Sequence, residues 1–163
     1  MANFGQIEKR VGELREKLSQ KGLDGALITK RENYIYLSGF TGTFANLIVT
    51  KEKAILITDF RYVEQAKSEA SYYEIVQLYD SISETLNDLI TSCGIKRLGF
   101  EDDYMTWKSY DEFCNKFDNS KLVPLEGSVE LQRIIKDDDE IEVIRDAVRL
   151  ADEAFSHVLK YIR

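Results

Sequence analysis

The sequence is poor in the residues that most often form catalytic centres. Its 163 residues include one histidine, one proline, one tryptophan and two cysteines. A hydrolytic metal site needs several ligands that converge on one point, and one imidazole with no placed partner does not indicate such a site. Ser-His-Asp catalysis would have to use His157, which no Gly-x-Ser-x-Gly motif accompanies, and a Cys-His pair would need Cys93 or Cys114 beside it. No spacing singles out a carboxylate pair among the 29 acidic residues, so these residues alone do not indicate an enzyme.

Positive charge and long apolar runs are also scarce. The formal net charge of -7 argues against nucleic acid as a partner, because phosphate binding requires a basic face. Residues 1–10 lack the apolar segment of a secretory leader, and no stretch approaches the length that crosses a bilayer. Cys93 and Cys114 lie 21 positions apart. We interpret them as reduced thiols of a cytoplasmic protein, and the sequence leaves a disulfide between them open.

The residues that are abundant predict a packed core. The chain is 44% hydrophobic, with nine tyrosines and eight phenylalanines, and its length suits one domain with an appended element. Apolar residues at helical spacing from Ile7 to Leu18 predict an amphipathic helix that ends at Gly22. Residues 23–28 predict a turn and a short strand, and residues 45–50 pair with the strand from Ala54 as an antiparallel hairpin. Residues 33–37 fit either a short strand or an irregular turn.

The second half alternates strands and helices. The expected elements are a strand at 74–78, a helix capped by Ser83 and ended by Gly94, a strand at 96–100, a helix from about Thr106, and an edge strand at 121–125 that contains Pro124. The helix from Thr106 carries an aromatic stripe that we assign to the core rather than to a cofactor site. Together these elements predict an α/β fold in which helices pack against a mixed sheet.

Residues 54–66 join a strand to a helix. The apolar run from Ala54 predicts a buried strand, and Thr58 or Asp59 is expected to cap a helix from Phe60 to about Ala70. In an open α/β sheet such a junction lies at the carboxyl end of a strand, where these folds place ligands and partners. Arg61 and Tyr62 there would reach a carboxylate or a peptide, although position alone favours a surface ion pair and a packed ring.

The last segment predicts a long amphipathic helix. Asp137 and Glu140 have the spacing of a capping box, and the acidic run from Asp137 suits the positive end of a helix better than it suits a metal. An apolar seam then continues to the end of the sequence over about 25 residues, through Ile141, Ile144, Val148, Ala151, Phe155, Val158 and Ile162. Such a face requires a partner, either another domain or another copy of the chain.

Three motifs in register resemble the amino-terminal domains of the creatinase/prolidase family. Residues 33–42, NYIYLSGFTG, are similar to the family's YLTGF-G segment, and residues 58–66, TDFRYVEQA, to its TDGRYxEQA element. Residues 133–147 resemble its R-x-x-K-x-x-x-E-I-x-x-I-R-x-A junction. The order and spacing fit across essentially the whole chain, and the most similar members are Xaa-Pro aminopeptidases and Xaa-Pro dipeptidases.

The resemblance implies a ribonuclease-H-like mixed sheet in residues 1–132, flanked by helices. Residues 133–163 would be a linker and the first helix of a following pita-bread domain that is absent here. In the family that domain holds a pair of divalent metals, commonly manganese or cobalt, on two Asp, one His and two Glu, and none of those ligand motifs is matched in this sequence. The expected chain is therefore an inactive piece of a metallopeptidase that has no metal site or cofactor of its own.

The resemblance also implies binding surfaces. Amino-terminal domains of the family help to form dimers, and residues at the Arg61 element contact substrate in certain members. We therefore expect Phe60, Arg61 and Tyr62 to contact proline-containing peptides, although Phe60 stands where many members have glycine. An interface with the missing domain or with a second copy is expected on the last helix, at Ile141, Ile144, Val148, Phe155, Val158 and Ile162.

The first functional interpretation is an accessory domain, for oligomerisation and substrate access, of a cytoplasmic metallopeptidase that cleaves Xaa-Pro bonds. The alternative is a non-catalytic module of the same fold that binds peptide or protein. A second alternative is a domain of a creatinase-like amidinohydrolase. Downstream metal ligands distinguish the first two interpretations, and the pocket beside the metals distinguishes the third.

Overall fold

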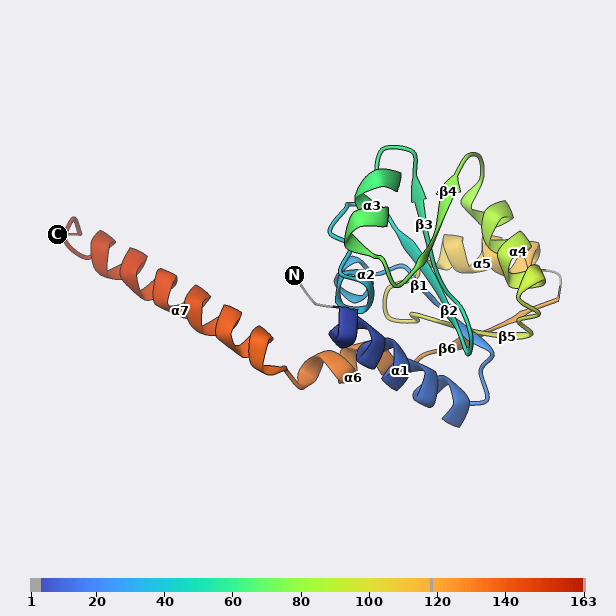
Figure 1. Ribbon diagram of the computed structural model, residues 1–163, viewed down its shortest axis with the longest axis horizontal. Coiled ribbons are helices and arrows are strands. Elements are labelled where there is room, and N and C mark those ends of the chain that lie inside the picture. The colour runs from blue at the N-terminus through green and yellow to red at the C-terminus, as the bar shows by residue number, and fades with distance from the viewer. Residues whose placement is uncertain (1–3, 118, 163) are drawn as a thin grey trace. The chain divides into compact units, whose positions relative to one another are not determined.

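The computed structural model describes residues 4–117 and 119–162 and divides into two compact units, Met1–Gln132 and Arg133–Arg163. The elements in chain order are α1 (Phe4–Gln20), β1 (Gly25–Ile28), α2 (Arg31–Ser38), β2 (Asn46–Thr50), β3 (Ala54–Asp59), α3 (Val63–Glu69), β4 (Glu74–Leu78), α4 (Ile82–Ser92), β5 (Arg97–Phe100), α5 (Trp107–Lys116), β6 (Lys121–Pro124), α6 (Ser128–Ile134) and α7 (Asp138–Val158). The first unit contains a sheet with helices on both faces (Figure 1).

The strands of the described residues form one six-stranded sheet in the order β4-β3-β2-β1-β5-β6. β2 is antiparallel to its neighbours β1 and β3, while β3 with β4, β1 with β5, and β5 with β6 are parallel. This mixed sheet flanked by helices agrees with the expected ribonuclease-H-like α/β fold. The predicted hairpin and the predicted edge strand with Pro124 are both confirmed.

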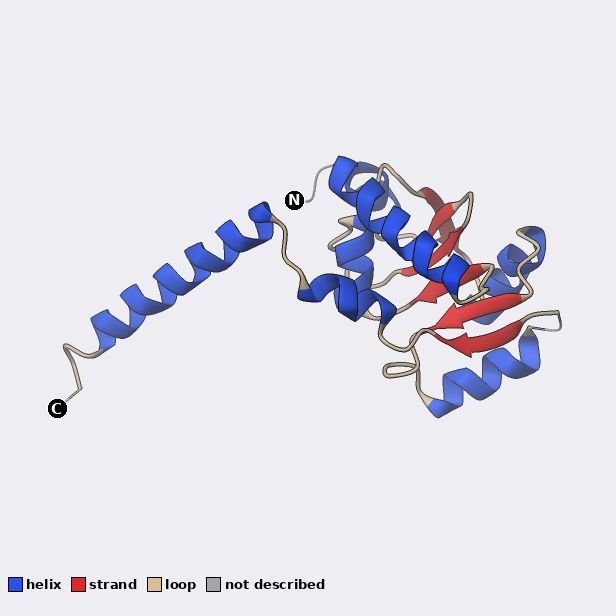
Figure 2. Cartoon of the chain, turned by 90° about the horizontal axis from the view of Figure 1, so that it is seen from below, coloured by secondary structure: helices blue, strands red, loops and turns tan. Residues whose placement is uncertain are grey.

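Two hydrophobic clusters cover the two faces of the sheet, as Figure 2 shows for the helices on either side. Successive residues of a strand point to opposite faces. In β1, Ala26 and Ile28 therefore join the cluster under α1, α2, α3 and α6, and Leu27 joins the cluster under α4 and α5. All four residues of β1 are buried, as expected for a strand covered on both faces.

Residues 31–38 form the helix α2, so the expectation of a strand or irregular turn at 33–37 was wrong. Tyr34 and Leu37 are buried three positions apart, which is helical spacing. The helix ends at Gly39, whose φ of 76° is the left-handed conformation that glycine adopts most easily. The side chain of Lys30 does not cap its first turn, and the backbone N–H of Lys30 donates instead to the carboxylate of Glu101, which follows β5.

Two helix starts and the placement of one aromatic residue differ from the sequence predictions. α3 begins at Val63 rather than Phe60, because residues 59–62 first form a turn in which Tyr62 N–H donates to the carbonyl of Asp59 at 3.0 Å. α4 begins at Ile82 after Ser81, and Ser83 is buried inside it. α5 begins as expected, with Thr106 accepting from the amide of Ser109, but its first residue Trp107 is 77% exposed rather than part of the core.

The second unit contains α7. Asp137 and Glu140 form the predicted capping box, in which each side chain accepts from the other's backbone N–H. The helix spans 21 residues and ends at Val158, so Ile162 lies beyond it and the expected length of about 25 residues was too long. Apart from the half-buried Ile141, its large apolar side chains are exposed in this chain, from 48% for Ile144 to 69% for Val143. No helix among the described residues is both long and apolar enough to cross a membrane.

Candidate functional site at the carboxyl edge of the sheet

The parallel strands β1, β3, β4 and β5 end at one edge of the sheet, together with the start of the antiparallel strand β2. The chain places three groups of polar side chains at this edge. They are the turn after β3, the loop from Gly39 to Phe44 before β2, and a buried network around Glu101 after β5. This edge is where open α/β sheets bind ligands.

Arg61 is held by the residue that ends β3. Its Nε and Nη2 donate to the two carboxylate oxygens of Asp59, at 3.0 and 2.7 Å, and its backbone N–H donates to Oδ1 at 3.0 Å. The guanidinium lowers the pKa of Asp59 and its own pKa is raised in return. The bidentate geometry fixes the direction of the guanidinium, which is exposed, while the Asp59 side chain is half-buried. The neighbouring Phe60 is 74% exposed.

Tyr62 contacts the loop from Gly39 to Phe44. Its hydroxyl lies 2.7 Å from Oγ1 of Thr43, and its ring meets the buried ring of Phe40 edge-on at a centroid distance of 6.1 Å. The Arg61 guanidinium lies 5.2 Å from the centroid of the Tyr62 ring. The structure thus contains the ion pair and packed ring that position alone favoured, while the role of Phe60, Arg61 and Tyr62 as substrate contacts stays a prediction.

The loop from Gly39 to Phe44 has no regular secondary structure, yet contacts from three elements hold it. The hydroxyl of Tyr34 on α2 donates to the carbonyl of Gly42 at 2.8 Å, and Thr58 on β3 donates to the carbonyl of Phe44 at 2.7 Å. From α3, Glu69 accepts the backbone N–H of Thr41 at 2.8 Å and its hydroxyl at 3.0 Å. A loop fixed in this way presents its exposed groups in one arrangement, as a binding loop requires.

The carboxylate of Glu69 holds the loop through Thr41, and the pH dependence of this contact can be measured. Burial raises the pKa of Glu69, but hydrogen bonds from Thr41 and Gln65 outweigh that effect and leave the pKa below that of an ordinary glutamate. A carboxyl with a lowered folded-state pKa contributes stability above its unfolded pKa of about 4.3, and that contribution is lost as the pH falls through the folded value. We expect the stability advantage of the native chain over Glu69→Gln to shrink as the pH is lowered from 7 to 3.

Denaturant unfolding at each pH and the amide NMR shift of Thr41 measure this effect. The matched control is Glu64→Gln, because Glu64 lies on the same helix and its carboxylate pairs with Lys67 instead of the loop. The control should leave the Thr41 amide shift and its titration unchanged. If the Thr41 amide shift changed with pH in the same way in the native chain and in Glu69→Gln, Glu69 would not be the residue that holds the loop.

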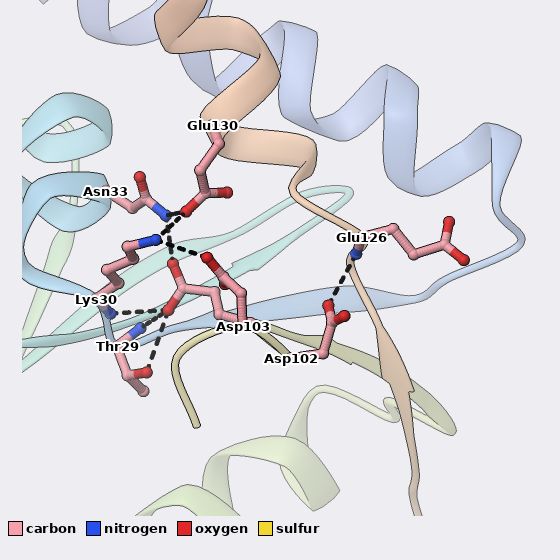
Figure 3. A network of polar contacts seen from close by, with 8 residues as sticks. Thr29, Lys30, Asn33, Asp102, Asp103, Glu126 and Glu130 are labelled. Atoms are coloured by element: carbon pink, nitrogen blue, oxygen red, sulfur yellow. Dashed lines mark hydrogen bonds and ion pairs between the residues drawn. The ribbon is translucent and has the colours of Figure 1, made fainter. Parts of the chain in front are cut away.

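Glu101 follows β5 and is almost fully buried, with 2% of its surface exposed. Its Oε2 accepts the backbone N–H groups of Thr29 and Lys30 at 2.6 and 2.8 Å, and its Oε1 accepts Nδ2 of Asn33 at 2.7 Å (Figure 3). These donors surround the first turn of α2, so Glu101 caps a helix that has no side-chain cap of its own. Burial raises the pKa of Glu101, and the hydrogen bonds only partly offset that effect.

Lys30 extends the network to α6. Its Nζ donates to Asp103 at 2.7 Å and to Glu130 at 2.8 Å, and Asn33 also donates to Glu130, at 2.6 Å (Figure 3). The hydrogen bonds that Lys30 donates to Asp103 and Glu130 raise its pKa. Burial raises the pKa of Glu130, but its bonds to Lys30 and Asn33 outweigh this and lower it. The network connects residues at the ends of β1 and β5 with α2 and α6. Each of its described polar groups has a hydrogen-bond or ion-pair partner, so we expect the network to stabilise the packing of these elements.

Sequence analysis missed the Glu69 anchor and the Glu101 network. One signal was available for Glu101, since Glu101, Asp102 and Asp103 directly follow a predicted strand at the edge where ligands bind. The other residues considered for catalysis were two cysteines and one histidine. Cys93 is half-buried and Cys114 exposed, both as free thiols, and the ring of His157 on α7 lies 5.2 Å from that of Tyr161. Among the described residues, no group of three or more His, Cys, Asp or Glu is arranged to hold a metal ion.

Comparison with known proteins supplies the family. The model of the Creatinase/Prolidase N-terminal domain matches residues 10–135. The chain belongs to this family. An uncharacterized peptidase of Bacillus subtilis, YqhT, is 40% identical over 154 residues, which are 94% of this chain and 44% of that protein. The family assignment inferred from the three sequence motifs is therefore confirmed.

Solved structures of the family agree with the fold. The Xaa-Pro dipeptidase from Bacillus anthracis superposes with a TM-score of 0.93 at 39% identity, over 96% of this chain and 44% of that one. The N-terminal domain of the cytoplasmic peptidase PepQ from Mycobacterium tuberculosis superposes with a TM-score of 0.69 at 32% identity, over 75% of this chain and 96% of that domain. The chain thus matches the N-terminal domain of Xaa-Pro peptidases and spans less than half the length of the curated relatives it matches.

Proposed function

We propose that the chain acts as the N-terminal accessory domain of a cytoplasmic metallopeptidase that cleaves Xaa-Pro bonds. The observation that carries this proposal is the match at 39% identity to 44% of the Bacillus anthracis Xaa-Pro dipeptidase, together with the match to an isolated N-terminal domain. Residues 1–132 are then the family domain, and residues 133–163 the linker and first helix of the catalytic part. Within this proposal, the manganese or cobalt pair and the cleavage of the Xaa-Pro bond are assigned to that catalytic part.

A domain fusion tests this function. The 163-residue chain alone is expected to leave an Xaa-Pro dipeptide intact in the presence of Mn²⁺. The same chain fused after Arg163 to the remaining residues of the Bacillus anthracis dipeptidase is expected to hydrolyse it. The fusion without residues 1–132 is the control, and it should lose efficiency toward the dipeptide. A control as active as the full fusion would overturn the accessory role.

The turn after β3 is the proposed substrate contact within this function. Phe60 is exposed, and Arg61 is aimed by Asp59, as an anchor for a peptide carboxylate or carbonyl would need to be. In the active fusion, Arg61→Ala is expected to raise KM about fivefold with little change in stability, because Arg61 is exposed. Lys67→Ala removes a comparable exposed cation from α3 and should leave KM unchanged. Unchanged KM and kcat for Arg61→Ala would remove the substrate role.

The apolar face of α7 is the proposed interface for oligomerisation. Ile144, Val148, Phe155 and Val158 lie at helical spacing and are each 48–65% exposed, and Ile141 extends the row toward the helix start. We expect light scattering to give the mass of two chains at high concentration. Phe155→Asp should return the mass of one chain, and Arg149→Ala on the polar face should not. A native chain that stays monomeric at high concentration would count against this interface.

One comparison favours a second function. A creatinase of a Bacillus strain is 26% identical over 97% of this chain, so an accessory domain of a creatinase-like amidinohydrolase is the second candidate. Creatine hydrolysis by a fusion to the creatinase catalytic part, without activity in the dipeptidase fusion, would favour it.

A further inference from the structure

The ring of Tyr62 lies against the guanidinium of Arg61. Cζ of Arg61 is 5.2 Å from the centroid of that ring, within the distance at which an aromatic face attracts a cation. The guanidinium also pairs with Asp59, but an ion pair whose cation is exposed contributes little by itself, because water screens it. The ring therefore supplies a second contact that holds Arg61 in one arrangement.

Two contacts from one loop hold the ring in place. The hydroxyl of Tyr62 lies 2.7 Å from Oγ1 of Thr43, and its ring meets the buried ring of Phe40 edge-on. Phe40 and Thr43 both belong to the loop from Gly39 to Phe44. This loop, which precedes Tyr62 by about 20 positions in the chain, therefore determines where the face of the ring points.

The backbone is fixed on both sides of Thr43. The carbonyl of Gly42 accepts the hydroxyl of Tyr34 at 2.8 Å, and the carbonyl of Phe44 accepts the hydroxyl of Thr58 at 2.7 Å. A hydroxyl carried between two bonded carbonyls occupies a defined position, as a group that orients a neighbouring side chain must. The side chain of Thr43 is itself exposed, so core packing does not account for its place in the loop.

We infer that Thr43 is a positioning residue for Arg61 and acts through the ring of Tyr62. This inference rests on the proposed function, in which Arg61 contacts the substrate, and it adds a residue of the loop to that site. Arg61 uses Nε and Nη2 for Asp59, and no acceptor among the described residues binds its Nη1. A guanidinium held in this way keeps the two N–H groups of Nη1 available for a carbonyl or carboxylate oxygen of a peptide.

Hydrogen exchange of the Arg61 Nε–H, followed by NMR in the 163-residue chain, tests the contact without an activity assay. Thr43→Val keeps the shape of the side chain and removes its hydroxyl. It is expected to speed the exchange about threefold, the effect of losing one exposed cation–π contact. Thr43→Ser keeps a hydroxyl and should exchange at the native rate. Thr91→Val is the matched control, because Thr91 is exposed on α4, which covers the other face of the sheet.

Kinetics of the active fusion separate positioning from loop structure. Thr43→Val is expected to raise KM about threefold with kcat unchanged, because it acts on binding through Arg61. In an Arg61→Ala background the same substitution should change KM no further, since the group that it positions is gone. A residue that only supports the loop would raise KM equally in both backgrounds, and that result would overturn the inference.

Two other results would overturn it. They are a native exchange rate in Thr43→Val, and a Thr43→Ser variant that behaves like Thr43→Val. Hydrolysis by the fusion measures the proposed function separately. An inactive fusion with faster exchange in Thr43→Val would remove that function and leave the placement of Arg61 by Thr43 standing. An active fusion with native exchange in Thr43→Val would leave the function standing and remove Thr43 from the site.

Discussion

Glu101→Ala is expected to lower the free energy of unfolding by about 3 kcal/mol, because it leaves buried donors without an acceptor. The donors are the backbone N–H groups of Thr29 and Lys30 and the side-chain amide of Asn33. The loss is large because Glu101 is buried and also caps the first turn of α2. Urea unfolding followed by circular dichroism measures the change.

Glu101→Gln is the matched control, since it keeps the shape and one acceptor oxygen. That oxygen can still accept from Thr29 and Lys30, while the new amide group faces the amide of Asn33. A loss of about 1 kcal/mol is expected, well below that of alanine. Equal losses for alanine and glutamine would mean that the charge, rather than the hydrogen bonds, stabilises this edge. No loss for alanine would contradict the network as a structural element.

Gly42→Ala is expected to lower the free energy of unfolding by about 2 kcal/mol through steric conflict. A Cβ at this position would lie 2.2 Å from Cζ of Phe40, whose ring is fully buried and packs against Tyr34 and Tyr62. The ring cannot move without disturbing the loop that Tyr34 holds through the carbonyl of Gly42. Thermal unfolding and the NMR signals of residues 39–44 report the change.

Gly12→Ala provides the comparison within the same chain. Gly12 lies in the interior of α1, and nothing lies within 4 Å of a Cβ added there. Alanine should therefore stabilise the chain by about 0.7 kcal/mol, through its higher helix propensity. A gain in the free energy of unfolding at Gly12 and a loss at Gly42 would show that close packing around Phe40 decides the effect of alanine at Gly42. Stabilisation at both positions would contradict the clash.

Local periodicity predicted the elements whose structure depends on neighbours in sequence. Ile7, Val11, Leu14 and Leu18 predicted α1 because helical spacing puts them on one face, and all four are buried. The capping box of Asp137 and Glu140 was predictable because both residues lie within one turn. The three family motifs likewise depend only on residue types and spacing, and the family they indicate is confirmed.

Sequence patterns failed where a distant segment decides the local structure. Residues 33–37 carry a weak helical pattern, and α2 is capped by Glu101, which lies 68 positions after Asn33. The start of α3 moved from Phe60 to Val63 because Asp59 binds Arg61 in a turn instead of capping a helix. Periodicity contains no information about such contacts, so only the folded chain reveals them.

The sequence by itself determined the family, the hairpin and its flanking strands, the first helix and the capped start of the last one, because each depends on residues close together in the chain. Tertiary structure alone decided the composition of the carboxyl edge. Thr41 donates to Glu69 across 28 positions, and the backbone N–H of Thr29 donates to Glu101 across 72 positions. The physical reason is that a sheet brings strand ends together by backbone pairing, whatever side chains those ends carry.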